Sequence, residues 1–176
     1  MGRIYERVEK CVDSIRKITD FVPRVGLVLG SGLGDYADSI EVVSEASYSA
    51  IESFPVSTVP GHDGKFIFGY VDSVPVVCMK GRVHHYEGYR MEEVVLPIRV
   101  MKMLGAEILF LTNAAGGLQD GMKPGDFMLI TDQISCFVEN PLIGENDEKI
   151  GPRFPDMSHV YDRELCDIVR NAAKDN

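Results

Sequence analysis

The sequence is poor in positive charge. Its 176 residues include 18 lysines and arginines against 27 aspartates and glutamates, which gives a formal net charge of −9. Proteins that wrap nucleic acid or lie on anionic membranes need clustered Lys and Arg, so the charge argues against both classes of partner. Any phosphate that the chain binds must therefore be small and held by a few local groups.

The sequence also lacks the residue spacings of metal sites. The four cysteines form no CxxC pair and lie far apart, mostly in apolar stretches, so we expect reduced core residues of a cytosolic protein. No histidine pair has the HxxxH spacing of a helical metal site. We therefore expect no metal ion and no cofactor. The cysteines are Cys11, Cys78, Cys136 and Cys166.

Long apolar runs are absent as well. None approaches the roughly 18 residues of a membrane span. The amino terminus has neither the apolar segment of a secretory signal nor a myristoylation pattern, because Glu6 breaks the latter. We expect a cytoplasmic protein that does not bind membranes. The length suits one domain, residues 1–176.

Apolar patterning predicts alternating helices and strands. Helical spacing marks the first twenty residues, a segment from 94 to 104 with Gly105 as its stop, and a last helix from 162 onward. Buried or β-rich runs mark strands at 25–29, 41–46, 66–71, 74–80, 108–112 and 127–134. The alternation favours an α/β sheet covered by helices, with small-molecule sites at the loops that follow the strands.

The most informative loop is the segment 81–89, GRVHHYEGY. If it is extended, Arg82, His84 and Tyr86 point to the same side. Arg82 offers a planar fork of donors that suits a phosphate edge, and His84 can add a hydrogen bond. Glu87 could orient His84 if the chain turns at the following glycine. The alternative is a polar connection between two strands.

A glycine-rich loop, GSGLG at 30–34, follows the first predicted strand. A dinucleotide-binding loop would need glycine or alanine where Asp35 stands, and no glycine precedes a Lys-Ser or Lys-Thr pair as in a Walker A loop. The remaining hypothesis is an anion nest of backbone N–H groups with the Ser31 hydroxyl. A tight turn that needs glycine dihedral angles explains the loop equally well.

Three further loops contain candidate residues. His62 stands in a turn, where a histidine is more often solvated than functional. The segment 113–117, NAAGG, lets a ligand approach the backbone, and Asn113 can make directed hydrogen bonds, although an ordinary exit from a strand has the same pattern. Phe154 lies in a proline-flanked loop and either fills a core or covers a ligand.

Taken in order, five motifs closely resemble those of the trimeric purine nucleoside phosphorylases. They are GSGLG at 30–34, VPGH at 59–62, GRVH with YEGY at 81–89, TNAAGG at 112–117 and RFP at 153–155. The methylthioadenosine phosphorylases share the general plan, but the segments PGH at 60–62 and HYEGY at 85–89 look like the purine nucleoside branch. The resemblance implies a mixed central β-sheet flanked by helices, without the carboxyl-terminal part of that fold.

The resemblance also implies roles for individual residues. Phosphate would be bound by Ser31, His62, Arg82, His84 and the backbone at Ala114. The catalytic pair would be His84 and Glu87, with Glu87 supporting the histidine. Groups near the nucleoside would be Tyr86, Asn113, Ala114 and Phe154. Because Phe154 would cover the sugar in a neighbouring subunit, a homotrimer is implied. Inorganic phosphate would be a co-substrate, and no cofactor is implied.

In the chemistry of that family, phosphate attacks the ribose anomeric carbon as the purine leaves. The residues that meet the purine lie beyond residue 176, so this resemblance predicts little phosphorolysis by the chain alone and does not choose between 6-oxopurines and 6-aminopurines. Two hypotheses stay open. The chain is either part of a complete purine nucleoside phosphorylase or a short product that binds phosphate or assembles without catalysis. A dinucleotide-binding domain is a further alternative to these two hypotheses.

Overall fold

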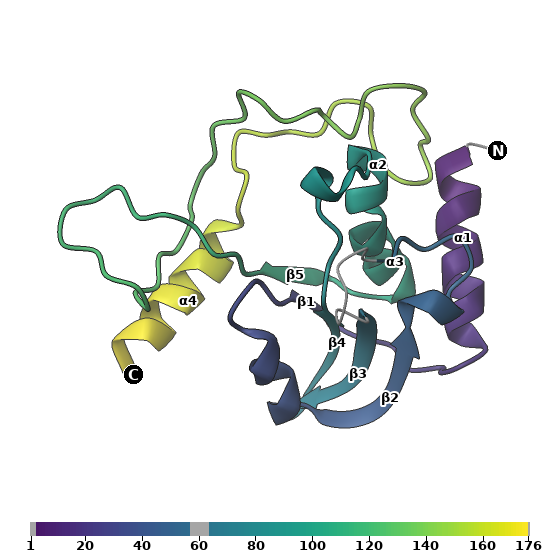
Figure 1. Cartoon of the computed structure of the whole chain (residues 1–176), viewed down its shortest axis with the longest axis horizontal. Helices are drawn as coiled ribbons and strands as arrows, with labels where there is room; N and C mark the ends of the chain where they lie inside the picture. Colours follow the sequence, from purple (N-terminus) through teal and green to yellow (C-terminus); the bar gives the residue numbers. More distant parts are fainter. Residues whose placement is uncertain (1–2, 57–63, 176) are drawn as a thin grey trace.

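A mixed five-stranded sheet forms the centre of the molecule in the computed structural model, which describes residues 3–56 and 64–175 (Figure 1). The strands are β1 (Val25–Val28), β2 (Glu41–Ser47), β3 (Lys65–Val71), β4 (Val74–Lys80) and β5 (Ile108–Leu111). They lie in the order β2-β3-β4-β1-β5. β1 runs parallel to β4 and β5, whereas β2, β3 and β4 pair antiparallel. The mixed sheet confirms the predicted fold class.

The helices and short helical turns connect these strands. The α-helices are α1 (Arg3–Arg16), α2 (Met91–Val94), α3 (Leu96–Leu104) and α4 (Arg163–Asp175). The 3₁₀ turns are η1 (Gly34–Ser39), η2 (Tyr48–Ala50) and η3 (His85–Glu87). α3 has its proline at the first turn, where a missing N–H costs nothing, and ends at Gly105 with φ 123°. Among the described residues, no helix is both long and apolar enough to span a bilayer.

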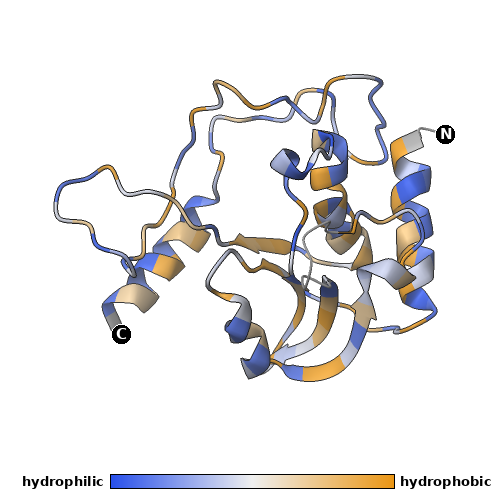
Figure 2. Cartoon of the chain, viewed as in Figure 1, coloured by the Kyte–Doolittle hydropathy of each residue, from blue (hydrophilic) through white to orange (hydrophobic). Residues whose placement is uncertain are grey.

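The larger core lies between the sheet and the pair α1 and α3 (Figure 1). Val8, Cys11 and Ile15 follow the helical spacing of α1 and are fully buried. On the other side of the sheet a smaller cluster includes Leu27, Ile67 and Cys78 and is completed by residues of and beside η1. Figure 2 shows apolar stripes on both helices and along the central strands. The two clusters fix the central strands, whose ends carry the candidate site.

The cysteines are only partly as predicted. Cys11, Cys78 and Cys166 are buried, whereas Cys136 is exposed, so the core assignment was wrong for that residue. Burial raises the pKa of the Cys78 thiol to about 12 and that of Cys11 to about 11. All four are free thiols, and the described residues hold no cluster of metal-ligating side chains.

Two predicted strands differ from the structure. The segment 127–134 forms no strand, and the described chain from Thr112 to Asp162 contains neither helix nor strand. β5 is present but is not buried, because Leu109, Phe110 and Leu111 are 40%, 44% and 51% exposed. β5 is the last strand of the sheet, so no strand of the described residues lies against its outer edge. A β-rich segment becomes a strand only when it has a partner, and 127–134 has none among the described residues.

Candidate phosphate site at the strand ends

Three loops meet where β1, β4 and β5 end, because these strands are parallel and their carboxyl ends lie at one edge of the sheet. The loop after β1 is joined to the segment after β5 by a hydrogen bond of 2.8 Å from Gly30 N–H to Thr112 Oγ1. The loop after β4 is joined to the same residue, since Arg82 Nη1 donates to Thr112 O at 3.3 Å. The predicted glycine loop, Arg82 and the segment around Asn113 are therefore brought together.

Glycine is required where the loop after β1 contacts the segment after β5. A Cβ atom on Gly30 would lie 2.7 Å from Thr112 O and 2.8 Å from Asn113 Cα. Such contacts with backbone atoms leave no room for any other residue. The chain then turns, with Leu33 N–H donating to Gly30 O at 3.1 Å and Gly32 at φ 85°. Ser31 is exposed at this turn.

Arg82 and His84 form the polar centre of the edge. Gly81, at φ 83°, turns the chain out of β4, and Arg82 Nε donates to His84 Nε2 at 3.3 Å. Because an arginine nitrogen can only donate, Nε2 acts here as an acceptor and Nδ1 holds the ring proton. Both side chains are half-buried. They present donors and one ring nitrogen to the same small space, as their alternation predicted.

Glu87 holds His84 from the protein side. Its Oε1 accepts from the His84 backbone N–H at 2.8 Å and lies 2.9 Å from His84 Nδ1. The Glu87 side chain is only 3% exposed, and Gly88, at φ 94°, makes the turn that brings it back. The predicted turn is thus present. The carboxylate fixes the ring orientation and directs Nε2 toward Arg82.

Tyr86 reaches the site by a different geometry from the one predicted. The segment is extended only as far as His84 and then enters η3, so strand alternation does not place Tyr86. Instead its ring stacks on the His84 ring, with centroids 4.7 Å apart and an interplanar angle of 18°. Tyr86 is 78% exposed. It therefore lies over the histidine with most of its ring open to a ligand.

The remaining candidates differ in how far the structure places them. Asn113 and Ala114 are exposed at the end of the β5 segment, where Asn113 Nδ2 donates to Ala114 O at 3.3 Å. His62 lies outside the described residues. Phe154 is 87% exposed in a loop that Arg153 holds through the carbonyls of Leu142 and Gly144, at 3.1 and 2.6 Å. The described contacts do not join Phe154 to the strand ends.

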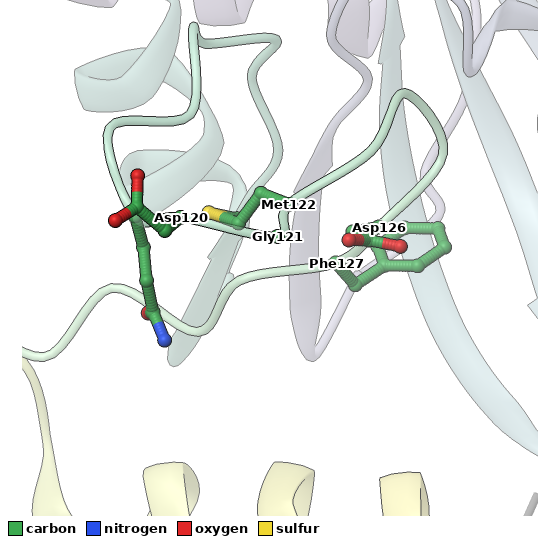
Figure 3. A pocket seen from close by; sticks show the side chains of 6 residues that line it. Asp120, Gly121, Met122, Asp126 and Phe127 are labelled. Atoms are coloured by element: carbon green, nitrogen blue, oxygen red, sulfur yellow. The ribbon is translucent and has the colours of Figure 1, made fainter.

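Two surface hollows of about 460 Å³ lie away from this edge. One is formed within the loop 119–127, where Figure 3 shows Asp126 and Phe127 on one side and Asp120 on the other. The second lies between α4 and the segments 131–132 and 158–161. Neither contains a predicted site residue. The polar cluster at the strand ends is the stronger candidate, because its groups converge through directed hydrogen bonds.

Sequence reasoning missed two residues that support the cluster. Thr112 joins the three loops, and its place at the end of an apolar run beside Asn113 was a usable signal. Tyr48 is 1% exposed and donates its hydroxyl to Gly81 O at 2.8 Å, which holds the end of β4. Burial raises the pKa of Tyr48 well above its usual value, so it remains a donor. Nothing in the sequence around Tyr48 indicates this contact.

The chain is similar to purine nucleoside phosphorylases in sequence and in fold. Purine nucleoside phosphorylase 1 of Bacillus subtilis is 48% identical over 170 residues, which are 97% of this chain and 63% of that protein. The Bos taurus purine nucleoside phosphorylase is 43% identical over 167 residues, 93% of this chain and 58% of that protein. The crystal structure of the Schistosoma mansoni protein in complex with inosine matches with a TM-score of 0.87 at 43% identity, over 97% of this chain and 61% of that one.

These matches extend over nearly the whole chain, which spans about 60% of the length of the relatives. The motifs at the strand ends lie within the matched region, and so does the mixed sheet that positions them. The sequence pattern of the phosphorylase superfamily matches residues 24–176. The chain therefore belongs to the phosphorylase superfamily.

Proposed function

We propose that this chain supplies the phosphate-binding part of a purine nucleoside phosphorylase. The observation that carries the proposal is the arrangement of Arg82, His84 and Glu87 at the ends of three parallel strands, with Arg82 3.3 Å from His84 and the carboxylate 2.9 Å from the other ring nitrogen. A guanidinium and a histidine that is oriented by a carboxylate suit a phosphate dianion. The inosine complex of the Schistosoma mansoni relative supports a purine nucleoside as the second substrate.

In the proposed reaction, a phosphate oxygen forms a bond to the anomeric carbon of the ribose while the bond from that carbon to the purine nitrogen breaks. The purine takes the electron pair and gains a proton, which balances the proton that the hydrogen phosphate dianion loses, and (deoxy)ribose 1-phosphate is released. Arg82 and His84 hold the dianion against the positive charge that develops on the sugar. Ser31, His62 and the backbone at Ala114 add further hydrogen bonds. Phosphate is a co-substrate, and no cofactor takes part.

The nucleoside and neighbouring subunits complete the proposal. Tyr86 and Asn113 contact the nucleoside from this chain. Phe154, 87% exposed, covers the sugar bound to a neighbouring subunit of a homotrimer. A purine salvage enzyme of this kind works in the cytoplasm.

A second candidate function is phosphate binding without catalysis. The observation that favours it is the openness of the nucleoside side of the site. Tyr86, whose ring lies over His84, is 78% exposed, so its outer face is not covered by the described residues. Without a wall to orient the nucleoside and a group to protonate the purine, the reaction loses several powers of ten in rate.

Phosphate-dependent cleavage of inosine by the 176-residue chain tests the proposal, with binding of inorganic phosphate measured in parallel. Arsenate replaces phosphate in one series. Arg82→Ala is compared with Arg24→Ala, which removes an exposed arginine just before β1 that pairs with Glu107 at 3.5 Å. We expect phosphate binding that only Arg82→Ala abolishes.

The rate of cleavage separates the two candidates. Turnover that Arg82→Ala abolishes and Arg24→Ala preserves supports the enzyme. Binding without turnover supports the second candidate. If the wild-type chain does not bind phosphate at all, the proposed site is wrong.

A further inference from the structure

We propose that Thr112 is the positioning residue of the phosphate site, a role that rests on the function proposed above. Thr112 directly follows β5 and is half-buried between the loop after β1 and the loop after β4. Its side chain holds the first of these loops and its main chain holds Arg82 of the second. One residue thereby sets the distance between the groups that meet the anion.

The side-chain hydroxyl of Thr112 makes two hydrogen bonds, one as an acceptor and one as a donor. Thr112 Oγ1 accepts from Gly30 N–H at 2.8 Å and donates to Val28 O at 2.9 Å. The Thr112 backbone N–H donates to the same Val28 oxygen at 3.0 Å. A hydroxyl has one proton and two lone pairs, so both contacts can be made at once. They extend the pairing of β1 with β5 up to the residue before Ser31.

The carbonyl group of Thr112 couples that loop to Arg82. Its oxygen accepts from Arg82 Nη1 at 3.3 Å. The same oxygen lies 2.7 Å from the place where a Cβ atom of residue 30 would stand, so Gly30 packs directly on it. A shift of the β1 loop therefore moves the acceptor that directs the guanidinium. The position of Ser31 and the direction of Arg82 are set together.

Substitutions of Thr112 can separate the effect of its hydroxyl group on loop position from the effect of its side-chain packing. Valine keeps the branched shape of threonine but cannot accept from Gly30 N–H, so that donor must turn toward water and the loop moves away from Arg82. Serine keeps the hydroxyl and loses only a methyl group. We expect Thr112→Val to raise the dissociation constant for phosphate roughly tenfold or more, and Thr112→Ser to keep it within roughly threefold of the wild type.

The test is calorimetric titration of the 176-residue chain with inorganic phosphate, with melting temperatures recorded for every variant. Thr19→Val is the matched control. Thr19 Oγ1 also accepts from a backbone N–H, that of Phe21 at 3.2 Å, but in the segment that leads into the other end of β1. The control should lose a comparable hydrogen bond and keep its phosphate affinity.

Hydrogen exchange of the Gly30 amide in the wild type gives a measurement that does not depend on the folding of any variant. We expect slow exchange, because Thr112 Oγ1 accepts this N–H. The proposal is overturned if the Gly30 amide exchanges as fast as the amides of an open loop. It is also overturned if Thr112→Val binds phosphate as the wild type does, or if Thr112→Ser loses phosphate affinity as Thr112→Val does. A wild type that binds no phosphate overturns the site itself, which distinguishes failure of the proposed function from failure of the role of Thr112.

Discussion

Arg82 and His84 are each held by a partner on the protein side of the site. Arg82 Nη1 donates to the main chain of Thr112, and His84 Nδ1 faces a carboxylate that is 3% exposed. Side chains held in this way lose little conformational freedom when a ligand binds, which favours affinity. At the scale of the residue, the supporting contacts are therefore as important as the groups that meet the anion.

Glu87→Gln tests this support for His84. Glutamine keeps the shape and an oxygen but removes the negative charge, so its hydrogen bond with His84 Nδ1 is weaker and the ring orientation is less firmly held. We expect the dissociation constant for phosphate to rise about tenfold, equivalent to ~1.4 kcal/mol. Calorimetric titration of the purified variant measures the change.

Glu93→Gln is the matched control for that experiment. Glu93 caps α2 as Glu87 caps η3, since its Oε2 accepts from the Arg90 backbone N–H at 3.1 Å, but its ion-pair partners in the described part of the chain are Arg7 and Arg90 instead of a histidine. The phosphate affinity of the Glu93→Gln variant should stay at the wild-type level. If both variants lose phosphate affinity equally, the two caps matter only for local folding. If Glu87→Gln binds phosphate as the wild type does, Glu87 does not support His84 in binding.

At the scale of the element, sequence patterns locate helices and strands whose partners are nearby. The helical spacing of Val8, Cys11 and Ile15 predicts α1, and the two β-rich runs around Asp72 predict the β3–β4 hairpin, in which Val71 pairs with Val74. The predicted loops also lie at strand ends. In each case the pattern reflects burial against a partner that is present in the structure.

The same reasoning fails where a partner is distant or absent. The segment 127–134 has the composition of a strand, yet the described part of the chain places no strand beside it, and Phe127 and Ile134 are 89% and 91% exposed. Tyr86 was misplaced because a 3₁₀ turn replaces the extended chain after His84. The Tyr48 contact with Gly81 joins residues far apart in sequence, so no local pattern indicates it.

Hydrogen exchange can distinguish the strand predicted for residues 127–134 from the irregular segment in the structure. We expect their amides to exchange rapidly, because the described chain provides no strand to accept their hydrogen bonds. The amides of β4, which is paired on both sides, should exchange slowly and serve as the internal reference. Slow exchange throughout 127–134 would show that the strand predicted from the sequence forms in solution.

At the scale of the whole molecule, the two edges of the sheet are unequal. β2 at one edge carries Glu41 and Glu45 and has a register shift between Val42 and Ser44, features that discourage pairing with another chain. β5 at the other edge consists of four apolar residues with neither charge nor shift. The β5 edge is therefore the place where the isolated chain is most prone to self-association.

Phe110→Lys places a charge on this edge. We expect the isolated chain to associate as its concentration rises, and the variant to associate less, because a lysine on an edge strand discourages pairing. Light scattering over a concentration series measures the effect. Val43→Lys adds the same charge at the β2 edge, where Val43 is 55% exposed, and should leave association unchanged. A wild type that stays monomeric at all concentrations would contradict the expectation.

The topology of the sheet also sets an order for folding. β3 and β4 are joined by a two-residue turn, and β2 pairs with β3, so the partners in these antiparallel contacts are closer in sequence than the partners of β1. β1 must instead find β4 and β5, which lie far along the chain, and such parallel pairings form slowly. Because Gly30, Arg82 and Thr112 come together only when those pairings are made, a refolding chain gains its affinity for phosphate in the last stage.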